Sequence, residues 1–197
     1  MRVVTLTEPP GPEQPLFIEF VNTLHWDEGA PIELIGDQAD FAEWLAEHSL
    51  PGVALDSWLP PLWSLREHAR AITEALIRSQ QLPEADLDAL KRALAEPGGR
   101  LVLVDDRDGR LEVAFQATGD DASVVMFQIA LSLANFLAVG ERHRLKLCAN
   151  PGCGFAFLDT STNRTRRWCD MRYCGNRRKV RAFRRRHKAM DGVPIST

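Results

Sequence analysis

Apolar residues recur at helical spacing in several segments of the first 140 residues. Residues 38–48 place Phe41, Trp44 and Leu45 on one face and are followed by Pro51, which predicts an amphipathic helix that ends there. The same period predicts a helix from about residue 61 to 79 and another from about residue 83 to 95. The first half of the chain is therefore expected to be mostly helical.

Residues 123–139 are the most apolar stretch of the chain. At this length, and with Gln128, Ser132 and Asn135 among the apolar residues, the stretch is too short and too polar for a membrane span. We therefore expect a buried central helix and no association with a membrane. The three polar side chains recur at helical spacing, so they must hydrogen-bond to each other, to a nearby backbone or to a small ligand.

The period changes to that of strands after residue 99. Residues 100–105 and 110–116 flank a Gly-containing turn at residues 106–109, which predicts a β-hairpin. The apolar run at residues 16–24 fits either a strand or a helix, and its pattern does not separate the two. Residues 1–15 contain four prolines and predict an extended N-terminal arm.

All four cysteines lie in the last quarter of the chain, as two Cys-x4-Cys pairs at Cys148, Cys153, Cys169 and Cys174. Two short-spaced pairs separated by a hairpin-length insert predict one structural zinc ion held by four thiolates. Disulfides are the main alternative, but the N-terminus has no signal-peptide pattern and cytosolic thiols stay reduced. A catalytic zinc ion would need an open ligand position, which four thiolates leave closed.

The segment around these cysteines predicts a treble-clef finger. Pro151-Gly152 favours a sharp turn between the first two ligands, and residues 155–158 predict a strand. Residues 159–163 then predict a polar turn, residues 166–169 a returning strand, and Cys174 the first turn of a helix of about 14 residues. A unit of this size cannot build a sufficient core, so metal binding must supply much of its folding free energy.

Charge is segregated along the chain, although the formal net charge is only −3. Residues 1–140 carry 9 Lys and Arg against 23 Asp and Glu, whereas residues 141–190 carry 15 against 3. A basic segment attached to an acidic body is typical of a protein whose one end approaches a polyanion. A solvated basic face that only maintains solubility is the alternative, but solubility does not require segregation.

The basic side chains of the finger are the candidate phosphate contacts, because guanidinium groups pair with phosphate through two hydrogen bonds and can also read guanine. These residues are Arg166, Arg167, Arg177, Arg178, Lys179, Arg181, Arg184 and Arg185.

The motifs of the finger closely resemble those of the CGNR zinc-finger proteins, bacterial proteins proposed to regulate transcription. The resemblance rests on CANPGC at residues 148–153, Phe157-x-Asp159-x-Ser161, RRWCDM at residues 166–171 and CGNR at residues 174–177. It implies a treble-clef finger that binds DNA, preceded by an ABATE domain that senses a ligand. Phe20-Val21-Asn22-Thr23 is similar to the opening motif of that domain. Glu19 and Thr162 depart from the family pattern, which leaves the ligand open and removes one phosphate contact.

The fold class expected from these features is α+β, with a mostly helical N-terminal domain that contains a β-hairpin, followed by the small zinc finger. The expected divisions are an arm at residues 1–15, the ABATE-like domain at 16–140, the finger at 141–190 and a flexible tail at 191–197. Candidate ligand-binding residues are those in or next to the family motif and on the apolar helix: Asn22, Thr23, His25, Trp26, Gln128, Ser132 and Asn135.

We therefore predict a cytoplasmic, zinc-dependent, DNA-binding transcription regulator whose N-terminal domain senses a small ligand or forms a homodimer. An RNA-binding module and a protein-interaction finger, which could dock on an acidic partner or on its own N-terminal domain, are the alternatives. The sequence contains no nucleophile-base pattern, phosphate-binding loop or paired-carboxylate motif, so no enzymatic activity and no catalytic residue are predicted.

Overall fold

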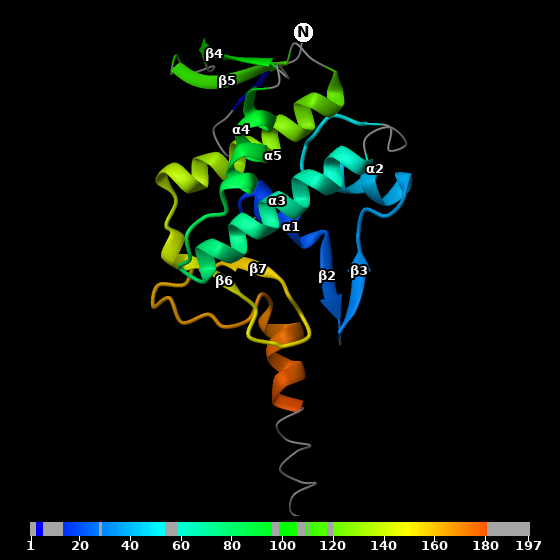
Figure 1. The fold of residues 1–197 in the computed structure, drawn as a ribbon, viewed down its shortest axis with the longest axis vertical. Coiled ribbons are helices and arrows are strands. Elements are labelled where there is room, and N and C mark those ends of the chain that lie inside the picture. Colours follow the sequence, from blue (N-terminus) through cyan, green and yellow to red (C-terminus); the bar gives the residue numbers. More distant parts are fainter. Residues whose placement is uncertain are drawn as a thin grey trace, which may run out of the picture.

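The protein consists of a helical body with a β-hairpin at one end and the finger at the other (Figure 1). The computed structural model describes residues 3–5, 14–27, 29–53, 59–95, 99–105, 109, 111–117 and 120–180. Its helices in the body are α1 (Leu16–Asn22), α2 (Gln38–Glu47), α3 (Leu59–Ile77), α4 (Glu84–Ala95) and α5 (Asp121–Val139). Its strands are β1 (Val3–Thr5), β2 (Leu24–Asp27), β3 (Ala30–Glu33), β4 (Gly99–Asp105), β5 (Leu111–Ala117), β6 (Leu145–Leu147) and β7 (Ala156–Leu158).

The segment whose pattern left strand and helix open forms α1, the most enclosed helix of the body. Phe17, Ile18 and Phe20 are all 0% exposed, and Val21 is 2% exposed. Only Leu16 and Glu19 of this helix are partly exposed, so it has almost no polar face, which explains why its sequence shows no helical period. It contacts α3, α5 and β7, and two apolar clusters that share these helices form the core of the body.

The helices predicted from periodicity are confirmed within one or two residues at α2, α3 and α4. Asp37 begins α2, because its side chain accepts hydrogen bonds from the backbone N–H groups of Ala39 and Asp40. The apolar stretch is confirmed as α5, which Asp120 caps in the same way through Ser123. By length and composition alone α5 could cross a membrane. In the structure it packs against α1 and α4.

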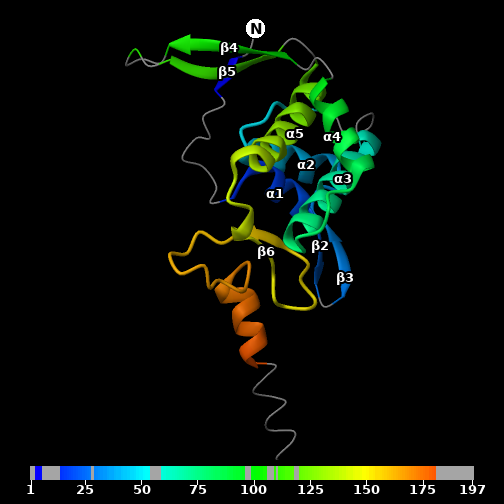
Figure 2. The same ribbon diagram turned by 60° about the vertical axis from the view of Figure 1, so that its left-hand side comes forward.

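None of the three small sheets was predicted in full. The hairpin β4–β5 is confirmed, with Leu103 opposite Val113. The N-terminal arm adds β1 to the other edge of β5 in antiparallel register, so the strand order is β1-β5-β4. A second hairpin, β2–β3, follows α1 directly and was not expected. It projects from the body toward the finger (Figures 1 and 2).

The finger does not stand apart from the body, although apolar content falls and positive charge rises near residue 140. Leu145 of β6 and Ala156 of β7 belong to the same buried cluster as residues of α1, α3 and α5. Because the finger has too little apolar surface to form its own core, it completes that core on the body.

One predicted element of the finger is wrong. Residues 166–169 were expected to return as a strand beside residues 155–158, but β7 pairs with β6, and no strand is found between residues 159 and 170. The reason lies in Asp159, whose buried carboxylate binds the backbone of the following loop and holds it in an irregular path. The loop at residues 148–155, which we call the knuckle, is itself the turn of the β6–β7 hairpin.

Candidate metal centre and nucleic-acid interface

The first two cysteines lie in the loop that joins β6 to β7. The N–H of Cys148 donates to the carbonyl of Phe155 at 2.8 Å, and the N–H of Cys153 donates to the carbonyl of Asn150 at 3.0 Å. Gly154 has φ +69, and a Cβ there would lie 2.8 Å from Cε3 of Trp26, so this position requires glycine. The turn thus directs both sulfurs toward one point while the body packs closely behind it.

The other two cysteines come from the start of the C-terminal helix. Asp170 begins the helical turn η2 (Met171–Gly175) and accepts a hydrogen bond from the N–H of Tyr173. Residues 176–180 continue this turn as α-helix. Cys174 therefore lies in the first turn of a helix, as predicted, and Cys169 lies just before its cap.

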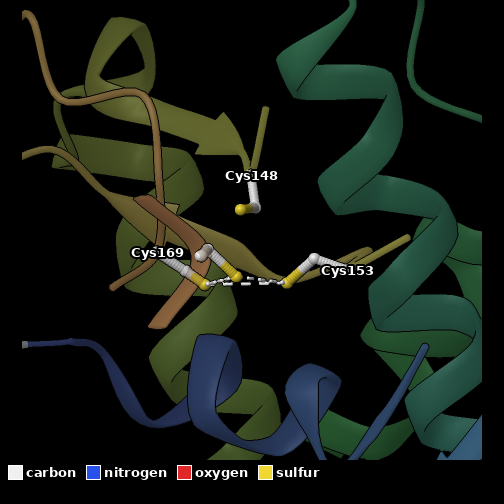
Figure 3. Close-up of side chains that lie close together, drawn as sticks. Cys148, Cys153 and Cys169 are labelled. Carbon is white, nitrogen blue, oxygen red and sulfur yellow. Dashed lines mark hydrogen bonds between the residues drawn. The ribbon is translucent and has the colours of Figure 1, made fainter. Parts of the chain in front are cut away.

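The four sulfurs form a closed cluster and lie within 4.8 Å of one another. The Sγ atoms of Cys153, Cys169 and Cys174 are separated by 3.6, 3.7 and 3.6 Å. Figure 3 shows the side chains of Cys148, Cys153 and Cys169 converging on this point. A tetrahedral zinc ion with Zn–S bonds of about 2.3 Å requires sulfur separations of about 3.8 Å. The donor set therefore fits a four-thiolate zinc site.

The thiols of this cluster are coupled through hydrogen bonds. Hydrogen bonds donated by the thiol of Cys153 and, to a smaller extent, by that of Cys169 lower the pKa of Cys148 to about 2. The same hydrogen bond to Cys148 raises the pKa of Cys153 to about 12. A metal ion that binds all four thiolates must displace these protons, so metal binding weakens as the pH falls. The side-chain N–H of Asn150 points at Sγ of Cys174 at 3.7 Å and can stabilise that thiolate.

A buried carboxylate organises the loop between the two cysteine pairs. Asp159 is 0% exposed and accepts hydrogen bonds from Nζ of Lys146 at 2.6 Å, from the N–H and hydroxyl of Ser161, and from the N–H of Arg166. Burial would raise the pKa of Asp159, but the hydrogen bonds from Lys146 and Ser161 lower it well below its ordinary value. Lys146 also donates to the carbonyl of Arg164. This network fixes the approach of Cys169 to the cluster.

Two of the predicted phosphate contacts are engaged within the protein. Arg166 donates to the backbone carbonyls of Trp168 and Cys169, and its guanidinium lies 5.1 Å from the ring centre of Phe157. Arg177 pairs with Asp27 of β2, with Nη2 3.3 Å from Oδ2 and a shorter contact from Nη1.

The contact between Asp27 and Arg177 joins the body to the basic helix. The guanidinium of Arg177 also lies 4.2 Å from the ring centre of Tyr173, whose hydroxyl is 3.4 Å from Oδ2 of Asp27. Hydrogen bonds from Arg177 lower the pKa of Asp27 below its ordinary value. We call the contact between Asp27 and Arg177 the clasp.

The remaining predicted phosphate contacts divide into two groups. Arg167, Arg178 and Lys179 are exposed, and the last two lie on the helix that projects away from the body (Figure 1). Arg181, Arg184 and Arg185 lie outside the described residues.

The family-motif residues Asn22 and Thr23 are tied to neighbouring structure. The side chain of Asn22 donates to the carbonyl of Ala156 and accepts from its N–H, both at 2.9 Å. Gln14 makes the same pair of bonds with Leu158, so two amide side chains complete the outer edge of β7. Thr23 accepts a hydrogen bond from Arg66 and donates to the carbonyl of Phe20.

His25 and Trp26 face the finger. The ring of His25 lies 4.6 Å from that of Phe155, and its Nδ1 atom is buried with no partner among the described residues. Burial is the main cause that lowers the pKa of His25. The N–H of Trp26 donates to the carbonyl of Cys153 at 3.1 Å. With Asn22, these two residues line a cavity of about 570 Å³ between the body and the finger.

The polar residues of α5 do not line this cavity. Ser132 accepts a hydrogen bond from the N–H of Phe17 at 3.2 Å and so satisfies the start of α1. Asn135 is exposed, and Nε2 of Gln128 is buried with no partner among the described residues. The structure thus brings three of the seven predicted ligand-binding residues to one cavity and places the others elsewhere.

Several residues that hold the β2–β3 hairpin on α3 were not singled out from the sequence. Arg66, 3% exposed, donates to both carboxylate oxygens of Glu33 at 2.7 and 2.5 Å. Arg70, 9% exposed, donates to the carbonyls of Val21 and Leu24, and it lies 5.2 Å from the ring centre of Trp26. Both arginines lie among the apolar residues of one face of α3. Their position on that face could have predicted a buried structural role from the sequence.

A closed four-cysteine cluster at a knuckle and a helix start, docked on a helical domain, defines a zinc-finger protein. A family model described as "CGNR zinc finger" matches residues 144–187. A second, described as "Putative stress-induced transcription regulator" and named ABATE, matches residues 14–140. The chain therefore belongs to the ABATE family and carries its domain and the finger in the predicted order. No curated protein matches the chain significantly.

Proposed function

We propose that the protein is a zinc-dependent regulator that binds specific sequences of double-stranded DNA through its finger. The observation that carries this proposal is the basic helix next to the metal cluster, which projects away from an acidic body and on which Arg178 and Lys179 are exposed. Residues 181–188 add further Arg and Lys directly after it. A DNA-binding regulator of this kind would act in the cytoplasm of a bacterial cell.

The electrostatic part of the proposal sets the salt dependence of binding. If six of the predicted basic residues contact phosphates, the logarithm of the binding constant falls with that of salt concentration at a slope of about −5. Arg166 supports the finger from within, so the exposed residues Arg167, Arg178 and Lys179 and the downstream arginines would supply most contacts.

Dimerisation would extend the DNA site. One finger helix covers only a few base pairs, so specific recognition in a genome favours two half-sites and a homodimer. Sedimentation of the protein alone and on its selected DNA tests this, and a monomer in both states would contradict it.

The first test is selection of bound duplexes from a random DNA pool by the zinc-loaded protein, with a chelated sample in parallel. We expect a short motif to be enriched only in the presence of zinc. Absence of enrichment by folded, zinc-loaded protein would refute DNA reading and would favour RNA or a protein partner.

A pair of double variants tests which charges are used. Arg178→Gln with Lys179→Gln should make the salt slope less steep by about 2, because two phosphate contacts are lost. The matched control removes the same charges from the body at Arg78 and Lys91, which are 56% and 70% exposed. Equal slopes in the two double variants would contradict the assignment of the basic helix.

A further inference from the structure

The cavity between the body and the finger has the size and position of a ligand site. Its volume of about 570 Å³ lies within the range of about 300–1,000 Å³ typical of small-molecule sites, which often form between domains. We propose that it binds a small organic cation, an amine with an apolar body, which competes with Arg177 for Asp27. This inference rests on the proposed DNA binding and goes beyond it, because it names a class of ligand and the contact through which that ligand would act on the basic helix.

The charges around the cavity favour a cation. Its lining includes the carboxylates of Glu19, Asp27 and Asp170, and three of the four cysteines form part of its wall. A zinc ion held by four thiolates leaves a net charge of −2 beside the cavity. Among the described lining residues, Arg166 is the only Arg or Lys, and its guanidinium already donates to two backbone carbonyls. An anionic ligand would meet the carboxylates of Glu19 and Asp170 and the negative charge of the metal centre there.

The apolar walls are largely aromatic, and aromatic faces attract cations. Trp26, Phe155, Phe157 and Tyr173 all line the cavity. The protein's own side chains indicate which groups these rings accept, because guanidinium groups lie 5.2, 5.1 and 4.2 Å from the ring centres of Trp26, Phe157 and Tyr173. A ligand that combines an ammonium group with an apolar body would use both the rings and the carboxylates.

The clasp provides the site of competition. Arg177 and Asp27 are both partly open to solvent, with 31% and 29% of their side chains exposed, so an external cation can reach the pair. When such a cation binds Asp27, Arg177 loses its carboxylate partner and becomes available to a phosphate. Ligand and DNA would therefore favour the same released state of the helix, and each would strengthen the binding of the other.

Calorimetric titration of the zinc-loaded full chain with three isosteric probes tests the ligand class without DNA. The probes are 2-phenylethylamine, 2-phenylethanol and phenylacetate. We expect the amine to bind at least about tenfold more tightly than the alcohol, and phenylacetate to bind least. Equal binding of amine and alcohol, tighter binding of phenylacetate, or no binding of the amine below about 10 mM would each overturn the proposal.

Two substitutions test the competition, with circular dichroism and zinc content used to verify the fold. Asp27→Asn should weaken amine binding about tenfold, whereas Asp40→Asn on the exposed surface of α2 should leave it unchanged. Arg177→Gln should strengthen amine binding, because it removes the internal competitor. A general loss of structure cannot produce this gain, and unchanged or weaker binding by Arg177→Gln would overturn the competition. Because no DNA is present, these results stand apart from those of the duplex selection.

Discussion

Asn22→Ala should destabilise the protein more than any other single loss of an amide side chain in α1 or α5. Its side chain makes two hydrogen bonds of 2.9 Å with the backbone of Ala156, and the two residues are 5% and 2% exposed. The substitution leaves a buried N–H and a buried carbonyl without these partners, at about 1–3 kcal/mol each. We therefore expect the free energy of unfolding to fall by about 2–6 kcal/mol.

The same substitution should weaken zinc binding, because the hydrogen bonds hold β7, which leads directly from the knuckle, on the body. Docking of the finger and zinc binding stabilise each other, so we expect the zinc affinity to fall about tenfold. Urea unfolding followed by circular dichroism measures the first effect, and competition with a chelator measures the second.

Asn135→Ala is the matched control, because it removes the same amide from an exposed position of α5. It should change the stability by no more than about 0.5 kcal/mol. If Asn22→Ala proves as mild as Asn135→Ala in both assays, then Asn22 does not couple the finger to the body and the reasoning is refuted.

Three further predictions concern the metal, the clasp and Glu19, the partly buried acid of α1. Removal of zinc, or Cys174→Ser, should lower the melting temperature and abolish DNA binding, and re-added zinc should restore only the wild type; unchanged melting would contradict a structural metal. Asp27→Asn should tighten DNA binding and make the salt slope steeper by about 1, because Arg177 gains a phosphate contact; weaker binding would instead indicate that Asp27 orients Arg177 for DNA. Burial raises the pKa of Glu19, so its ionisation opposes folding and stability is lost as the pH rises through the raised pKa. Glu19→Gln should therefore be more stable than wild type at pH about 7.5, and the difference should shrink toward pH about 4.5. Glu43→Gln at an exposed site of α2 should show no such dependence in thermal melts.

Elements with a clear period and a clear end could be predicted from the sequence. The helices α2 to α5, the hairpin β4–β5 and the four-cysteine cluster all depend on local spacing, so residues close in the chain were sufficient to identify them. α1 could not be assigned, because five of its seven residues are buried and little is left of the polar face that defines a helical period. β2 and β3 are four residues each and do not alternate, and Pro31 within β3 argues against a strand.

The arrangement of the finger on the body could not be predicted for a different reason. It depends on contacts between residues far apart in the sequence, such as Asn22 with Ala156 and Asp27 with Arg177, which are separated by 134 and 150 positions. Neither contact has a local pattern. Asn22 and Thr23 were expected to bind a ligand because of the family motif, and in the structure they connect the domain to its own finger and to α3.

The β2–β3 hairpin explains how an event in the body can reach the basic helix. Arg66 of α3 binds Glu33 of β3, and Arg70 of α3 binds the carbonyl of Leu24 in β2. These bonds hold the hairpin, and with it Asp27 at the end of β2, in place relative to the core. From the same hairpin Trp26 packs against Gly154 of the knuckle, while Asp27 holds Arg177. The hairpin therefore contacts both the metal loop and the basic helix. Because binding free energies are coupled reciprocally, any ligand that loosens Asp27 from Arg177 must itself bind more tightly once DNA has taken Arg177.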